Sequence, residues 1–220
     1  MGECSFVHFP ANKALTEYIK MNQITFKQYK SIDLTLICII TAIFETIATL
    51  ATNRWFNLQA MAISITLTMT CVALMRWSAY AVIPSAIGSL AFCIVSSATP
   101  IQYLIYCGGS IFSLLSLIII KRVGKEKLRR DFVWRLIFVT FTYLSTVLGR
   151  WLISLLFEPS LMSLVTFITT DILSLLFAVV VMSLLKGADG MIEDQKEYLL
   201  RIDRESKEEE AANLNDPFSK

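Results

Sequence analysis

Three ionisable side chains lie deep within apolar stretches of this sequence: Glu45, Arg150 and Asp171. A charge inside a membrane is costly enough that such residues indicate a functional site by default. At 1.5 Å per helical residue, Glu45 lies about 13 Å from Arg54, at the outer end of its stretch. Arg150 and Asp171 lie about 12 Å and 16 Å from the turn at Glu158. The three groups are therefore predicted to share one layer in the outer half of a membrane.

Arg150 and Asp171 are predicted to meet, because a tight turn joins their stretches and makes them neighbours. One interpretation is a salt bridge that only ties two helices together. The cost of removing both charges from water often exceeds their attraction, which favours a functional role instead. Aromatic and hydroxyl residues nearby suggest a pocket, open to the outside, for a small polar or zwitterionic molecule that contains a ring. The predicted substrate-binding residues are Glu45, Arg54, Trp55, Tyr103, Tyr106, Arg150, Trp151, Thr170 and Asp171.

Six apolar stretches, joined by short polar turns, must position these residues. The chain is 55% hydrophobic and 17% charged, whereas a soluble domain carries about 25% charged residues. A membrane crossing takes about 20 apolar residues. The fold class predicted is therefore an all-α integral membrane protein, a compact bundle of six transmembrane helices. The predicted spans are residues 32–52, 58–75, 77–95, 101–120, 132–157 and 161–185.

Lysine and arginine residues predict the orientation of these spans, because they collect in short cytoplasmic loops. The segment 121–130 holds six of them, and the N-terminal segment holds several more. With six spans these segments fall on one side, which places both termini of a multi-pass cell-membrane protein in the cytoplasm. The predicted organisation is a cytoplasmic N-terminal segment (1–31), the transmembrane domain (32–185) and a cytoplasmic amphipathic and acidic tail (186–220).

Histidine and cysteine usage argues against several kinds of chemistry. The single histidine, His8, lies in the N-terminal segment, so no histidine is available inside the membrane for a metal centre, a proton relay or a catalytic pair. The five cysteines show no CxxC spacing, so neither a zinc site nor a disulfide framework is expected. We expect no catalytic residues, no metal and no cofactor. The tail is predicted either to lie on the membrane surface or to dock a cytoplasmic partner.

Four sequence features together resemble a known family. They are Tyr106-Cys107-Gly108-Gly109, Leu148-Gly149-Arg150-Trp151, Thr170-Asp171, and the closing run from Asp189 to Gln195 followed by Tyr198-Leu199-Leu200-Arg201. With six short-looped spans in about 200 residues, the chain resembles the substrate-binding S component of an energy-coupling factor (ECF) transporter. The resemblance extends from Met21 to about Arg204.

This resemblance implies an importer subunit rather than an enzyme. It would capture a vitamin-like molecule or cofactor precursor near the outer surface, within the loop after the first span and spans four to six. A transmembrane coupling subunit and two ATPase subunits would be its partners. The sequence holds no GxxxxGK[ST] motif, so an ATP-driven process would need an ATPase on another chain.

Three other classes stay open at this point: a proton- or ion-coupled secondary carrier that acts alone, an intramembrane enzyme, and a membrane scaffold that transports nothing. A self-sufficient secondary carrier usually has two related halves with broken helices, and no clear internal repeat is visible here. An intramembrane enzyme would have only Glu45 and Asp171 as paired carboxylates.

Overall fold

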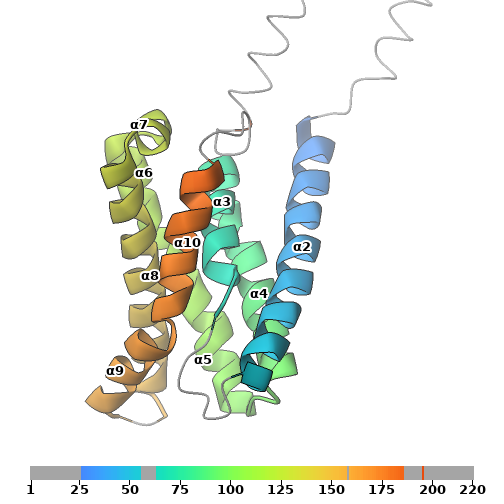
Figure 1. Ribbon diagram of the computed structural model, residues 1–220, viewed down its shortest axis with the longest axis vertical. Helices are drawn as coiled ribbons and strands as arrows, with labels where there is room; N and C mark the ends of the chain where they lie inside the picture. The colour runs from blue at the N-terminus through green and yellow to red at the C-terminus, as the bar shows by residue number, and fades with distance from the viewer. Residues whose placement is uncertain (1–25, 56–62, 158, 186–194, 196–220) are drawn as a thin grey trace, which may run out of the picture. The chain divides into compact units, whose positions relative to one another are not determined.

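The computed structural model describes residues 26–55, 63–157, 159–185 and Gln195, and every element within the first three ranges is a helix. The elements, labelled as in Figure 1, are α2 (Phe26–Trp55), α3 (Thr66–Trp77), the 3₁₀ helix η1 (Ser78–Ala81), α4 (Val82–Val95), α5 (Pro100–Ser110), the 3₁₀ helix η2 (Ile111–Ser116), α6 (Leu117–Val123), α7 (Lys125–Arg130), α8 (Phe132–Ser154), α9 (Leu161–Thr170) and α10 (Ile172–Leu184). Most of the predicted N-terminal segment, and the predicted tail except Gln195, lie outside the described residues.

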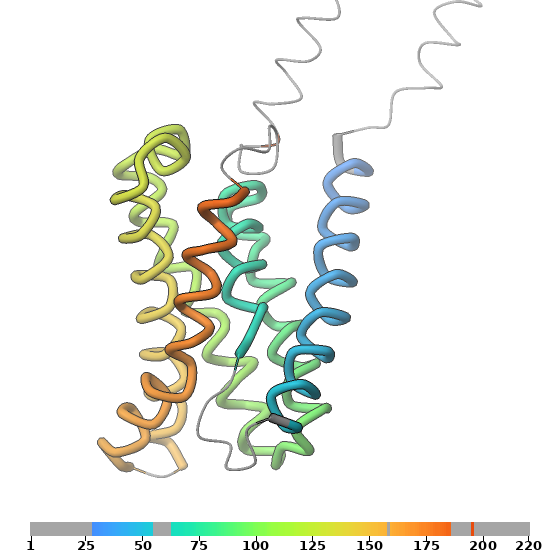
Figure 2. The backbone as a smooth tube through the Cα atoms, viewed as in Figure 1, coloured from blue at the N-terminus to red at the C-terminus, as the bar shows by residue number. Residues whose placement is uncertain are grey.

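Contacts divide the chain into two units, Met1–Leu36 and Ile37–Lys220. The described part of the first unit is the beginning of α2. Within the second unit, α5, η2 and α6 follow one another as a continuous run, and α8 returns alongside it (Figure 2). Helix α10 packs against both α8 and α3. Every described residue of the candidate site lies in the second unit.

Several helical runs are long and apolar enough to cross a membrane. Four meet this test directly: Gln28–Arg54, Thr66–Val95, Pro100–Val123 and Phe132–Ser154. A fifth is formed by α9 and α10 together, which are bent by 42° at their junction. For the part of the chain that the structure describes, the predicted all-helical class is therefore confirmed, and its long apolar helices are consistent with a multi-pass membrane protein.

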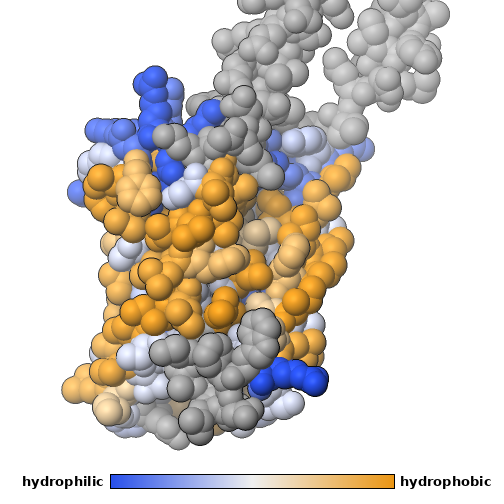
Figure 3. Space-filling view, viewed as in Figure 1, coloured by the Kyte–Doolittle hydropathy of each residue, from blue (hydrophilic) through white to orange (hydrophobic). Residues whose placement is uncertain are grey.

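Helix α2 turns its polar side chains inward. Within the second unit its buried face carries Thr41, Glu45, Thr49 and Thr52 at helical spacing. The opposite face is apolar, and at least half of each large side chain is exposed: Ile39, Ile43, Phe44, Ile47 and Leu50. Figure 3 shows a similar apolar covering over α8 and α10. Polar groups inside and apolar groups outside are what a lipid environment requires, because polar residues in membrane helices face the bundle interior.

The run Thr66–Val95, although long enough in total, folds back on itself, so its length is divided between α3 with 12 residues and α4 with 14 residues. A Cβ built on Gly88 of α4 would lie 2.1 Å from the Oγ1 of Thr66 in α3. Along a straight helix these residues would be about 33 Å apart. The chain reverses at η1, where Ser78 adopts a φ of 52°, and α3 and α4 form a helical hairpin (Figure 1). Position 88 must be glycine because a side chain there would overlap Thr66.

Three predicted spans are interrupted. The helix expected over 58–75 begins at Thr66 in the described residues, since Ile63, Ser64 and Ile65 precede it without helical structure. The span expected over 101–120 contains the 3₁₀ segment η2, and the span over 161–185 is broken at Asp171. Serine and aspartate side chains compete with the helix for backbone hydrogen bonds, which is consistent with α3 starting only after Ser64, whose Oγ accepts from the Thr66 amide, and with the break at Asp171. A hydropathy pattern shows how many consecutive residues are apolar. It does not show whether the backbone over those residues forms one unbroken helix.

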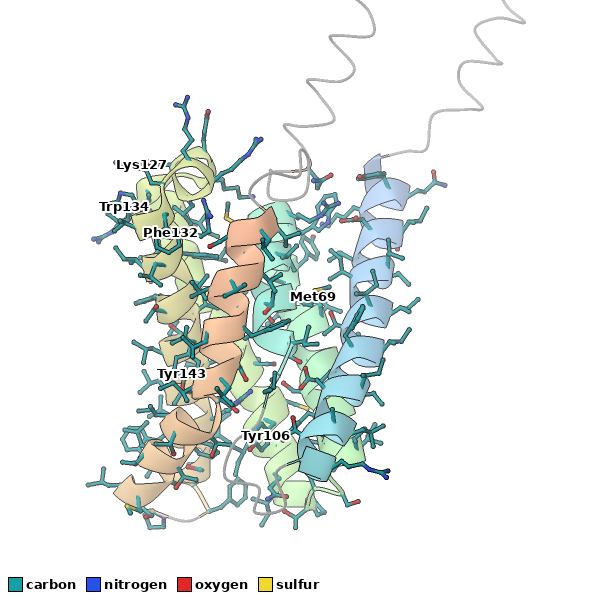
Figure 4. All side chains as sticks on the ribbon, in the orientation of Figure 1. Met69, Tyr106, Lys127, Phe132, Trp134 and Tyr143 are labelled. Atoms are coloured by element: carbon teal, nitrogen blue, oxygen red, sulfur yellow. The ribbon has the colours of Figure 1, made fainter. Side chains whose placement is uncertain are left out.

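The end of the second unit that carries α7 is basic, and Figure 3 shows hydrophilic side chains gathered there. The guanidinium of Arg135, which is buried, donates a hydrogen bond of 2.7 Å to the carbonyl of Arg129 near the end of α7. The ammonium of Lys127 lies 5.3 Å from the centre of the Trp134 ring (Figure 4). These contacts fix the short α7 against the first turns of α8.

Glycines allow α5 and α8 to pack closely. A Cβ built on Gly109 would lie 2.5 Å from Cγ of Arg150 and 2.9 Å from its backbone nitrogen. A Cβ built on Gly149 would lie 2.6 Å from the Phe112 ring. Because backbone atoms cannot move aside as a flexible side chain can, Gly109 determines how closely α5 approaches Arg150.

We expect Gly109→Ala to destabilise the protein by about 1–3 kcal/mol, the usual cost of overpacking. Gly108→Ala is the matched control, because its added methyl group meets only the flexible end of Ile153. Thermal unfolding in detergent measures both variants. Equal melting temperatures would show that the approach of α5 to Arg150 is not tightly constrained.

Candidate functional site

An ion pair joins α8 to the junction of α9 and α10. The guanidinium of Arg150 donates through Nη1 to Oδ2 of Asp171, and both side chains are almost entirely buried. The Tyr106 ring of α5 covers the guanidinium, with 4.7 Å between Cζ and the ring centre. Arginine over an aromatic face adds an attraction that strengthens when water is excluded. The pairing of Arg150 with Asp171, predicted from their matched depth, is therefore present.

Asp171 lies where α9 ends and α10 begins, so a helix break positions the carboxylate. In an unbroken helix the carbonyl of Ile168 would accept from the amide of residue 172. Here the Tyr143 hydroxyl donates to that carbonyl at 2.6 Å. The amides of Ser174 and Leu175 donate to the Asp171 carbonyl and start α10. Tyr143, labelled in Figure 4 with Tyr106, thus stabilises the break from α8.

Glu45 holds the start of α3. Its Oε2 accepts hydrogen bonds from the amides of Ile65 at 2.8 Å and Thr66 at 2.9 Å. The amide of Ser64 donates to Oγ of Ser174 in α10 at 2.8 Å. The first amides of a helix have no partner within it and carry partial positive charge, so a carboxylate is a favourable cap. Glu45 is fully buried, and its other oxygen, Oε1, has no hydrogen-bond partner among the described residues.

These groups surround a gap of about 10 Å³ inside the bundle. Its walls come from five places in the fold: α2, the start of α3, α4, α5, and the pair formed by α8 with the α9–α10 junction. The lining residues are Glu45, Ser64, Thr66, Ser89, Phe92, Tyr106, Arg150 and Asp171. The gap has room for about one water-sized species.

A larger cavity of about 220 Å³ lies beside this gap. Phe92 and Tyr106, whose ring centres are 5.1 Å apart, line both spaces. Among the described residues, the other polar groups on its wall are neutral: Thr49, Thr52, Asn53, Ser96, Gln102, Thr166 and Thr170. A cavity with neutral polar walls, an aromatic side and charged groups beneath it suits a small polar molecule.

The structure brings together some of the predicted site residues. Glu45, Tyr106, Arg150 and Asp171 line the small gap, and Thr170 lines the larger cavity with Tyr106. Those that line neither space are Arg54, which is exposed at the end of α2, Tyr103, which is half-buried, and Trp151. The Trp151 indole donates to the carbonyl of Ser160 at 3.3 Å. Trp55 is the last residue of α2, and its side chain lies outside the described residues.

Several residues of the site were not predicted from the sequence. Ser64, Thr66, Ser89, Phe92 and Ser174 line or stabilise it, and Tyr143 supports the helix break. The alternating hydroxyls of Ser64, Thr66, Thr68 and Thr70 within an apolar stretch were the available signal. An apolar span seldom needs so many hydroxyl groups, so this pattern indicates a polar interior.

Comparison with protein-family models, with curated proteins and with solved structures gives no match. The geometry of the site and the sequence pattern therefore carry the functional argument.

We expect Arg150→Ala to lower stability by about 3–5 kcal/mol, because it leaves the Asp171 carboxylate buried without its partner. The double variant Arg150→Met, Asp171→Leu should recover most of this loss, since apolar replacement of a buried pair is often neutral. Thermal unfolding of the purified protein measures both.

Arg54→Ala is the control, because Arg54 is exposed and its removal should change stability by less than about 0.5 kcal/mol. If the double variant has the same melting temperature as Arg150→Ala, the ion pair stabilises the protein in a further way, besides neutralising the Asp171 carboxylate.

Proposed function

We propose that this protein is a membrane-embedded binding protein that captures a small polar molecule for import. The observation that carries the proposal is the 220 Å³ cavity with neutral polar walls, which shares Phe92 and Tyr106 with the small gap. That gap is lined by the buried Arg150–Asp171 pair and by Glu45. Burial of three charged groups costs free energy that a purely structural bundle would avoid by using apolar residues. A binding site would explain why these charged groups are kept, because they could contact a polar ligand.

In this proposal the bundle crosses the membrane six times. The helical hairpin formed by α3 and α4 supplies two crossings, and α9 with α10 supplies the last one. An even number of crossings leaves both termini on the same side. The basic residues of α6 and α7 support a cytoplasmic position for that side, because lysine and arginine are retained there.

We propose further that the chain works as an ECF-type S component. The resemblance at Tyr106–Gly109, Leu148–Trp151 and Thr170–Asp171 supports this, and all three segments contribute to the two cavities or to the helix contacts around them. The ligand would be a vitamin-like or cofactor-precursor molecule. A transmembrane coupling subunit and two ATPase subunits would supply the energy, so this chain itself would bind and not hydrolyse ATP.

A second candidate is a secondary carrier that acts alone. Two features favour it: the break at Asp171 between α9 and α10, and the non-helical residues 63–65 at the buried start of α3. Carriers often bind substrates and coupling ions where helices are broken. The two candidates share the binding site and differ in the source of energy.

A ligand bound in the larger cavity should remain with the protein during purification in mild detergent and be detectable by mass spectrometry. Thr170→Phe, which places a ring in the cavity, should reduce the retained amount at least about tenfold, equivalent to about 1.4 kcal/mol. Thr169→Phe is the matched control, because Thr169 is exposed and does not line the cavity. Equal retention by the two variants would locate the ligand elsewhere.

Vesicles that contain only this chain should bind the retained molecule without accumulating it, because the proposed importer depends on ATPase partners. The measurement is uptake of the labelled molecule, with and without a sodium or proton gradient. Gradient-driven accumulation would replace the S-component proposal with the secondary carrier.

A further inference from the structure

Three buried polar atoms around the small gap have no hydrogen-bond partner among the described residues: Oε1 of Glu45, Oγ1 of Thr66 and Nε of Arg150. Glu45 is 0% exposed, and both amides that reach its carboxylate donate to Oε2. Oε1 is buried with no hydrogen-bond partner in the described part of the chain. We propose that Glu45 is a binding site for one small positive charge, a proton or a sodium ion, taken up on Oε1.

Charge balance around the gap supports this proposal. The charged groups that face it are Glu45 from α2, Arg150 from α8 and Asp171 from the α9–α10 junction. Arg150 is paired with Asp171, so among the described residues one carboxylate is left over. The other titratable groups described near these three are the phenols of Tyr106 and Tyr143 and the thiols of Cys93 and Cys107, and none of them supplies positive charge. An uncompensated carboxylate in an apolar interior is strongly disfavoured unless it is neutralised.

The start of α3 compensates only part of this charge. A helix N-terminus is equivalent to about half a positive charge, and its two amides are directed at Oε2. Oε1 gains no donor from them. The capping bonds therefore fix the orientation of the carboxylate and leave one oxygen turned to the gap.

The size and chemistry of the gap fit a proton or an alkali cation. The gap of about 10 Å³ holds about one water-sized species and no organic molecule. The Thr66 hydroxyl is also buried without a partner, and Ser64 and Ser89 add two further hydroxyls to the wall. Hard cations prefer such oxygen ligands. Within the ranges that the structure describes, no group of three or more His, Cys, Asp or Glu side chains offers a multivalent metal site.

The experiment measures thermal unfolding of the full chain in detergent without organic ligand, so it is independent of the proposed function. Sodium chloride is compared with N-methylglucamine chloride at equal ionic strength, between about pH 5 and about pH 9. Sodium binding predicts a melting temperature higher by about 3 °C or more in sodium. Proton binding predicts no sodium effect and a melting temperature that falls as pH rises, because the folded state must then lose a proton that stabilises it.

Glu45→Gln keeps the shape and the acceptor for the α3 amides and removes the charge, so it should abolish whichever response the wild type shows. Glu126→Gln, the same change at an exposed carboxylate, should leave that response intact. A wild type that responds to neither sodium nor pH would overturn the proposal, as would a response of equal size in Glu45→Gln. If Glu45→Gln does not fold, Thr66→Val tests the site instead: it removes the unpaired hydroxyl, and an unchanged sodium response would then exclude a sodium site between Glu45 and Thr66.

Discussion

The structure depends on how backbone amides are satisfied where helices begin and end inside an apolar bundle. A segment in hydrocarbon has no water to satisfy its backbone polar groups, so irregular backbone survives only where protein groups replace water. Helix α3 begins beside Gly88 of α4, and Gly88 lies about 10 Å along α4 from the end of that helix. The start of α3 is therefore inside the bundle and not at its end. The Glu45 carboxylate supplies the acceptor for its first amides. Without that carboxylate the Ile65 amide would lose its acceptor in the bundle interior, and the Thr66 amide would keep only its longer bond of 3.3 Å to Oγ of Ser64.

The same constraint explains the other side of the site. The break at Asp171 exposes a carbonyl that the Tyr143 hydroxyl satisfies, and Ser174 of α10 accepts from the backbone just before α3. The two irregular segments therefore stabilise each other across the bundle. Between them they leave a small polar gap and a neighbouring cavity in a structure whose outer faces are apolar. A site built in this way is closely packed on the side of α5 and α8, where glycines allow the helices to approach, and it includes the broken pair α9 and α10 on the other side.

Sequence reasoning predicted much of this arrangement for definite reasons. Apolar length predicted the helical membrane class, and depth along the helices predicted that Arg150 would meet Asp171, because a tight turn makes their helices neighbours. The same depth argument placed Glu45 in that layer, and the structure puts it at the same gap. The position of a residue along a helix does not show which way its side chain points around the helix axis. Tyr103 and Trp151 therefore lie at a suitable depth but line neither cavity.

The sequence by itself determined which residues are apolar enough to face lipid, which charges are deep, and where the turns lie, because these follow from composition and the 1.5 Å helical rise. The tertiary structure alone decided that α3 starts only after Ser64, that Asp171 separates α9 from α10, and that Glu45 caps α3. It also decided that Oε1 has no partner among the described residues. Those outcomes depend on contacts between residues distant in sequence, such as Glu45 with Thr66 and Ser64 with Ser174. A hydropathy pattern cannot reveal them, because it sums the properties of neighbours along one chain segment, whereas a hydrogen bond depends on where two segments meet.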